Sequence, residues 1–203
     1  MTFSRVMAID PSLTCSGWAL FDVRNLRLIG VGKIRTLPAR EGLSKRLVVL
    51  QGKVEQLFNK LNLNGNDVLI CEAPTTMRDP KAAFKVEQVR GIFEAVARSR
   101  QVRVPGRLNP RTVQYEVMGI KGRQLPRAEV KEIAVRIVGA LYGDQITKLG
   151  LVSDGENLKR HQDIVDAILV GSLAVSRVRS AVDTDLPVED FFDQGRKNHQ
   201  GVL

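Results

Sequence analysis

The sequence predicts a mixed α/β domain in which a five-stranded sheet is flanked by helices. Short apolar runs bounded by turn residues come first along the chain, and longer runs with helical periodicity follow. The predicted order, three strands, then helices and strands in alternation with helices last, is typical of this class. The chain has 203 residues, of which 43% are hydrophobic, and this is enough for one domain with a buried core.

The first three elements are predicted strands at residues 5–10, 17–23 and 27–36. Gly17 and Asn25 mark the turns, so these strands form an antiparallel meander. The first strand runs directly into Asp10. An ionised carboxylate at the end of a buried strand is rarely left unpaired. Asp10 is therefore either a turn residue that accepts hydrogen bonds from nearby amides or a metal ligand, and this segment alone leaves both readings open.

The rest of the chain alternates helices and strands before a long apolar helix. We expect helices over residues 42–61, 80–100, 110–118, 127–141 and 159–179, and strands over 68–71 and 102–104, with residues 143–157 irregular. The fourth strand also runs into an acid, Glu72. The last helix is apolar almost all round and therefore buried. We expect residues 1–180 to form the domain and residues 181–203 to be a loosely held polar tail.

Four carboxylates are expected to meet at one place. Asp10 and Glu72 each end an apolar strand, and parallel neighbours would bring them to the same sheet edge. Asp163 and Asp166 share one face of the last helix because they are three residues apart. A helix N-terminus alone would explain either of these two acids. The four together need cations, and all-oxygen sites suit Mg²⁺ or Mn²⁺, of which two can hydrolyse a phosphodiester.

The charge of the chain indicates a polyanionic partner. The net charge is +9, from 31 basic and 22 acidic residues. Between Arg98 and Arg136 there are ten basic and three acidic residues. This concentration of charge favours a nucleic-acid partner over a protein that is merely basic throughout. Our candidates for phosphate contacts are Lys85, Arg90, Lys121, Arg123 and Arg127.

Composition also limits the location of the protein. No apolar run is long enough to cross a bilayer, and the chain begins directly with a strand, so we expect neither a membrane span nor a signal peptide. Two cysteines without a CxxC pair favour a reducing cytoplasm over a disulfide framework or a zinc site.

These residues resemble the RuvC family of Holliday junction resolvases, within the RNase H-like superfamily. The matching segments are residues 9–13 with Gly17 and Trp18, Cys71-Glu72, residues 85–91, Val113 with residues 118–120, and residues 163–167. The resemblance implies an RNase H-like fold and a homodimer that nicks a four-way DNA junction symmetrically, with two divalent metals per active site held by Asp10, Glu72, Asp163 and Asp166. It also implies action on the DNA of a bacterial or phage-infected cell, at the nucleoid.

The chain departs from the family at several positions. The family often places an aromatic wedge shortly after the second acid, and residues 73–78 contain none. Met77 or Phe84 are the substitutes, although packing is the more common role for a residue such as Phe84. His161 does not fit the position where some members carry a histidine ligand, so we place it beside the metal ligands or toward the phosphate.

Three other functions compete with this interpretation. The same fold could cut a broader range of branched DNA or RNA–DNA hybrids. A junction-binding protein without catalysis would be expected to lack at least one of the four acids. An actin-like or sugar-kinase fold begins with a similar strand and phosphate loop, but it needs a second, duplicated domain and a later glycine-rich motif, which this sequence lacks.

Overall fold

The computed structural model describes residues 2–73, 79–122, 125–151 and 153–192. Its strands are β1 (Arg5–Asp10), β2 (Cys15–Asp22), β3 (Arg27–Arg35), β4 (Asp67–Glu72) and β5 (Arg107–Leu108). Its helices are α1 (Leu43–Lys60), α2 (Pro80–Ser99), α3 (Pro110–Glu116), α4 (Arg127–Lys148), α5 (Gly155–Lys159) and α6 (Gln162–Thr184), followed by the 3₁₀ turn η1 (Val188–Phe191). The strands form one sheet in the order β3-β2-β1-β4-β5. The predicted five-stranded sheet is confirmed.

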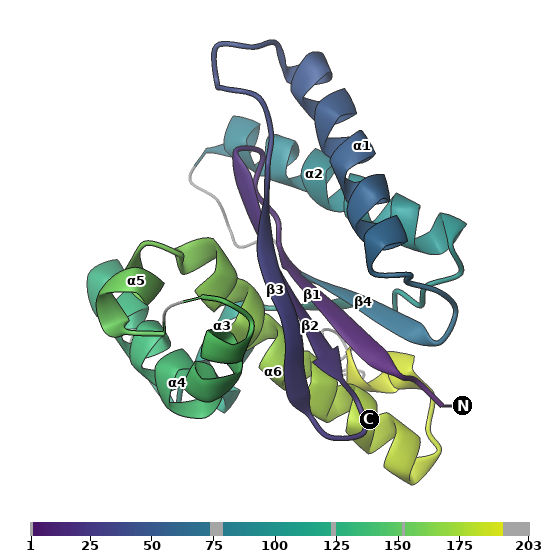
Figure 1. Ribbon diagram of the computed structural model, residues 1–203, viewed down its shortest axis with the longest axis vertical. Coiled ribbons are helices and arrows are strands. Elements are labelled where there is room, and N and C mark those ends of the chain that lie inside the picture. The colour runs from purple at the N-terminus through teal and green to yellow at the C-terminus, as the bar shows by residue number, and fades with distance from the viewer. Residues whose placement is uncertain (1, 74–78, 123–124, 152, 193–203) are drawn as a thin grey trace, which may run out of the picture.

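Helices cover both faces of this sheet. On β1, Val6 and Ala8 point into a core shared with α4 and α6, whereas Met7 and Ile9 point into a core shared with α1 and α2. This alternation is what the two-residue period of a strand dictates when both faces are buried. Figure 1 shows the resulting three layers, with α1 and α2 on one side of the strands and α3 to α6 on the other.

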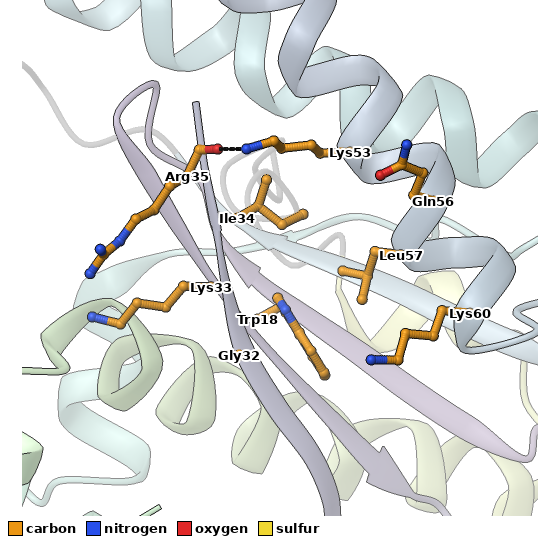
Figure 2. A pocket seen from close by; sticks show the side chains of 9 residues that line it. All are labelled: Trp18, Gly32, Lys33, Ile34, Arg35, Lys53, Gln56, Leu57 and Lys60. Atoms are coloured by element: carbon orange, nitrogen blue, oxygen red, sulfur yellow. Dashed lines mark hydrogen bonds between the residues drawn. The ribbon is translucent and has the colours of Figure 1, made fainter. Parts of the chain in front are cut away.

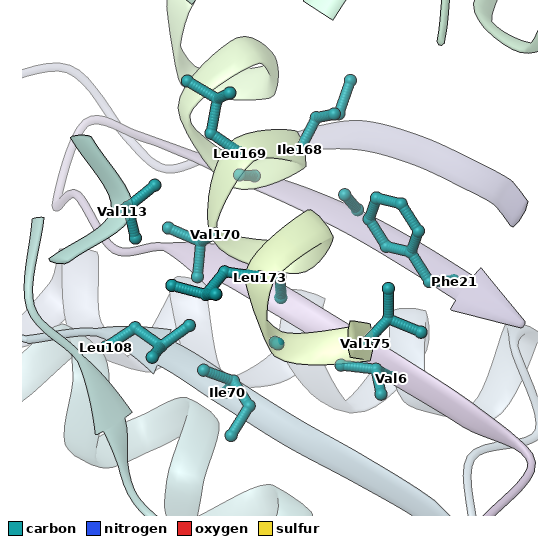
Figure 3. Close-up of a cluster of buried hydrophobic side chains, with 14 of the residues drawn as sticks. Val6, Phe21, Ile70, Leu108, Val113, Ile168, Leu169, Val170, Leu173 and Val175 are labelled. Carbon is teal, nitrogen blue, oxygen red and sulfur yellow. The ribbon is translucent and has the colours of Figure 1, made fainter. Parts of the chain in front are cut away.

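Helix α6 is the centre of the larger core. It is buried along most of its length and crosses β1 and β2. Figure 3 shows Val170 and Leu173 directed toward Ile70 and Leu108 of the sheet. Burying each such side chain stabilises the fold by about 1.5–3 kcal/mol. The helix can approach so closely because position 171 is a glycine, where any side chain would collide with the ring of Phe21.

The predicted strand over residues 102–104 is wrong. Arg103 forms only an isolated parallel bridge with Val68, and the fifth strand is instead the two-residue β5. Pro105 follows directly and has no N–H to continue the hydrogen-bond ladder. The chain therefore leaves the sheet there and pairs with β4 again only at Arg107 and Leu108.

The predicted irregular segment from residue 143 is also wrong, because α4 continues to Lys148 and α5 follows it. Gly143 lies beside Ser153, whose Oγ would be 3.8 Å from a Cβ placed at position 143. A small residue there allows the segment before α5 to pack on α4. The break comes at Gly150, whose φ of +84° ends the helix in the left-handed conformation that glycine adopts readily.

The expected boundary at residue 180 divides a helix. α6 runs on to Thr184 and turns at Asp185, whose φ is +52°. Val188 and Phe192 are then buried in the main core, so loose attachment is wrong for residues 181–192. The remainder of the expected tail lies outside the described residues. Across the described part of the chain, no helix combines the length and apolar character needed to span a membrane.

Candidate active site

The ends of two parallel strands bring Asp10 and Glu72 together. β1 and β4 pair in parallel with Ile9 opposite Cys71, so the next residue on each strand is one of the two acids. Both carboxylates therefore lie at the same edge of the sheet, as their positions in the sequence predicted. In sheets of this kind, ligands bind at the carboxyl ends of the strands.

A glycine on β2 brings α6 to the same edge. Gly17 lies opposite Asp10 in the antiparallel pair of β1 and β2. A side chain at position 17 would collide with the backbone carbonyl of Asp163, so only glycine lets the first turn of α6 rest on the strand. This contact places Asp163 directly beside the row that contains Asp10, and Asp166 follows one turn later on the helix.

The pKa shifts show that the carboxylates influence one another. Burial raises the pKa of Asp10 well above its ordinary value, and the negative charges of Glu72, Asp166 and Asp163 raise it further. Burial and the charge of Asp166 raise the pKa of Glu72 to about 7. Burial also raises the pKa of Asp166 to about 6, although the nearby Lys131 lowers it. The three groups therefore form one cluster of mutually repelling charge.

The oxygen donors of this cluster suit hard divalent cations, although the described side chains do not converge on one point. Within the described residues, no hydrogen bond or ion pair reaches the side-chain carboxylates of Asp10, Glu72 or Asp166. In that same part of the chain, no three His, Cys, Asp or Glu side chains converge closely enough to hold a metal. Buried carboxylates that no ion pair neutralises are suitable ligands for Mg²⁺ or Mn²⁺, and binding would require the side chains to rearrange.

Lys33 is a site residue that sequence reasoning missed. It lies on β3 opposite Gly17, and its Nζ is 3.0 Å from Oδ2 of Asp163. Burial lowers the pKa of the adjacent His161, and the positive charges of Lys33 and Arg35 lower it further. The available signal was a lysine near the end of a strand that pairs with the Asp10 turn, but strand order is needed to place it beside Asp163.

Arg90 is not a phosphate contact, which corrects the sequence prediction. The residue is buried, and its Nε donates a hydrogen bond of 2.8 Å to the backbone carbonyl of Glu72. Its guanidinium also pairs with Glu87. Arg90 therefore supports the end of β4 from behind, and its charge lowers the pKa of Glu72.

Part of the basic run that predicted nucleic-acid binding is likewise engaged within the fold. Arg107 Nε lies 2.7 Å from Glu94 and Arg107 Nη1 lies 3.1 Å from Glu87. Arg103 pairs with Glu189 at 2.5 Å. The concentration of positive charge between residues 98 and 136 is thus partly neutralised by acids from other elements.

The remaining predicted phosphate contacts that the structure describes are exposed. These are Lys85, Lys121 and Arg127. The positive charges of the half-buried Lys131, which the sequence analysis did not select for DNA, and of Arg127 lower the pKa of Asp166, so both residues lie near it. Arg123 and Met77 lie outside the described residues. The alternative of a packed Phe84 is wrong, because this side chain is 71% exposed.

Comparisons of the sequence with known proteins agree on one family. A family model described as "Crossover junction endodeoxyribonuclease RuvC" matches residues 6–142, a range that contains Asp10 and Glu72 and ends before Asp163. Relatives of that name include one from Chelativorans sp. (strain BNC1), 30% identical over 118 residues, which are 57% of this chain and 66% of that protein. Another, from Parvibaculum lavamentivorans, is 34% identical over 88 residues, which are 42% of this chain and 48% of that protein.

Solved structures share the fold. The Thermus thermophilus structure titled "T. thermophilus RuvC in complex with Holliday junction substrate" matches with a TM-score of 0.62 and 18% identity, over 88% of this chain and 96% of that chain. A second Thermus thermophilus RuvC structure matches with a TM-score of 0.62 and 19% identity, over 89% of this chain and 96% of that chain. The predicted RNase H-like architecture is thereby confirmed.

Proposed function

Because the chain belongs to the RuvC family of crossover junction endodeoxyribonucleases, we propose that it is a metal-dependent nuclease that resolves four-way DNA junctions by paired symmetric nicks. The observation that carries this proposal is the meeting of Asp10 and Glu72 at one sheet edge, with Asp163 brought beside them by Gly17. The curated relatives are matched over about two thirds of their length or less, so activity and substrate are proposed for this chain.

We propose Asp10, Glu72, Asp163 and Asp166 as ligands of two Mg²⁺ or Mn²⁺ ions. When bound, such ions activate a water and stabilise the leaving oxygen of a phosphodiester. The chain contributes the four oxygen donors from two strand ends and one helix. Burial and mutual repulsion raise the pKa values of Asp10, Glu72 and Asp166, so a cation that binds there would compete with protons for these three carboxylates.

Positively charged side chains near the site and elsewhere on the surface would hold the DNA backbone. Arg127 and Lys131 lie near Asp166, and Lys85 and Lys121 are exposed elsewhere on the surface. We retain Arg123 in this set on the basis of the sequence alone. Such contacts provide affinity that falls with salt and little sequence preference, so junction choice would come from the shape of the DNA.

Two further features of the proposal concern assembly and place. Paired nicks on opposite strands require two active sites related by symmetry, so we propose that the chain acts as a homodimer. The substrate is cellular or phage DNA at the nucleoid, so we place the activity in the cytoplasm.

The test is cleavage of a labelled synthetic four-way junction with Mg²⁺ or Mn²⁺, in parallel with a linear duplex, a flap and an RNA–DNA hybrid. We expect symmetric nicks on the junction that disappear with Asp10→Asn. Equal cutting of the flap or the hybrid would replace the junction by a broader class of substrate. Metal-independent binding without cutting would overturn the catalytic proposal.

A further inference from the structure

A groove of about 620 Å³ lies beside the carboxylates, between the edge strand β3 and helix α1. Figure 2 shows Trp18 beside Lys53, Leu57 and Lys60 of α1, whereas the side chains of Lys33 and Arg35 leave β3 on the opposite side, away from α1. Lys33 borders the groove from β3, and its side chain extends from the opposite face of this edge strand to Asp163, at 3.0 Å. The groove and the Lys33–Asp163 pair therefore flank the same edge strand from opposite faces.

The groove is strongly cationic. Its lining includes Lys33, Arg35, Lys53 and Lys60 and contains no Asp or Glu. Lys53 donates a hydrogen bond of 2.6 Å to the backbone carbonyl of Arg35, and Lys60 has no hydrogen bond or ion pair within the described residues. Unlike Arg103 and Arg107, Lys53 and Lys60 are not neutralised by acids from the described part of the fold.

An aromatic side chain forms the floor. The half-buried indole of Trp18 lies against β3, and a Cβ at position 32 would be only 2.7 Å from it. Gly30 and Gly32 thus leave room for the ring on the strand surface that faces α1, beside Leu57 and Lys60 (Figure 2). Cations that flank an aromatic platform are the combination with which proteins bind a strand of nucleic acid, through phosphates and stacked bases.

We infer that this groove binds a strand of the DNA substrate adjacent to the phosphate that is cut. The inference rests on the proposed function, because it gives that substrate a second contact surface outside the carboxylates. Lys33 holds positive charge on the active-site face of the edge strand, and Lys53 and Lys60 hold it on the groove face. A strand that enters here would pass along the Trp18 floor and place its phosphates beside α1.

The test measures binding of a four-way junction to the full-length chain carrying Asp10→Asn, which prevents cutting, over a range of salt concentrations. The double variant Lys53→Gln/Lys60→Gln removes two phosphate contacts, so the slope of log affinity against log salt should become shallower by about two. We expect binding at moderate salt to weaken by about tenfold. The control is Arg24→Gln/Lys148→Gln, which removes the same charge from two exposed residues outside the groove and should have a much smaller effect.

A second variant guards against loss of the bond between Lys53 and Arg35. Gln56→Glu adds one negative charge to the groove, keeps that bond, and should also weaken junction binding by severalfold. Thermal unfolding identifies any variant that is not folded. If both groove variants bound the junction as tightly as the control does, the proposal that the groove binds DNA would be overturned. Failure of the unmodified chain to bind or cut junctions at all would instead overturn the proposed function.

Discussion

Replacing Glu72 with glutamine should stabilise the metal-free protein at pH 8 while abolishing its nuclease activity. The pKa of Glu72 is raised from 4.5 to about 7, first by burial and then by Asp166. The folded state therefore binds the Glu72 proton more tightly than the unfolded state does. Stability from this group is fully present below pH 4.5 and is lost as the pH rises through about 7.

The shift sets the size of the effect. At 1.36 kcal/mol per pKa unit, a rise from 4.5 to about 7 corresponds to roughly 3 kcal/mol at pH 8. Glu72 keeps partial contact with solvent, which screens the repulsion, so we expect about 1–3 kcal/mol. At pH 4 the side chain is largely protonated in both states, and the variant should differ from the wild type by only a few tenths of a kcal/mol.

Urea unfolding in EDTA, followed by the fluorescence of the single tryptophan, measures this difference directly. The matched control is Glu156→Gln, which alters a glutamate that is 79% exposed and should change the free energy of unfolding by less than about 0.5 kcal/mol. Adding Mg²⁺ at pH 8 should stabilise the wild type more than the Glu72 variant. If the variant at pH 8 in EDTA were no more stable than the wild type, the reasoning that burial and Asp166 raise the pKa of Glu72 would be refuted.

Three other substitutions test how the site is built. Gly17→Ala should destabilise the fold by about 1–3 kcal/mol and impair cleavage, because the added methyl group displaces the first turn of α6 at Asp163. The control is Gly52→Ala, at a position on α1 that faces open space. It should leave cleavage unchanged, and urea unfolding should show a helix that is more stable by up to about 1 kcal/mol. Phe84→Ala removes a ring that is 71% exposed, so the free energy of unfolding should change by less than about 0.5 kcal/mol. Loss of junction cleavage without loss of stability would identify Phe84 as a DNA contact. Unchanged cleavage would exclude that role. Lys33→Gln frees Asp163 from an ion pair worth about 0.2–1 kcal/mol, so calorimetry should show Mn²⁺ binding up to about fivefold tighter, and weaker binding would mean that Lys33 instead orders the ligand.

The sequence contained the information that locates Asp10 and Glu72, because a buried strand is a local pattern. An apolar run that ends in an acid specifies where the carboxylate emerges, and the parallel pairing of β1 and β4 then brings the two ends together. The burial of α6 was predictable for the same reason, since its apolar surface extends all round the helix. Local periodicity was sufficient wherever the functional group stood at the end of an element.

Errors arose where the environment of a residue depends on distant segments. Residues 102–104 do not form the fifth strand, because Pro105 cannot continue the hydrogen-bond ladder there, and the return of the chain to β4 at Arg107 left no apolar pattern to detect. Helix α4 extends through Gly143 because the segment near Ser153 packs there. Val188 and Phe192 look like isolated apolar residues in a polar tail, yet both enter the core.

The positively charged residues show why composition alone could not place the DNA surface. Arg90 is buried because Glu87 and the Glu72 carbonyl satisfy its guanidinium, and no pattern within α2 distinguishes such an arginine from an exposed one. The Arg90 guanidinium lies next to the backbone of Glu72, and the Lys33 ammonium pairs with the carboxylate of Asp163.

Both cations therefore lie at the margins of the carboxylate cluster. Burial, rather than a neighbouring cation, dominates the pKa of Asp10, and Arg90 is the weakest of the influences on it. Asp10 forms no ion pair within the described residues, whereas Asp163 pairs with Lys33, so we expect binding of a divalent cation to depend strongly on Asp10. Asp10→Asn should consequently reduce the stabilisation by Mg²⁺ more than Lys33→Gln does, which titration of unfolding against metal concentration would measure.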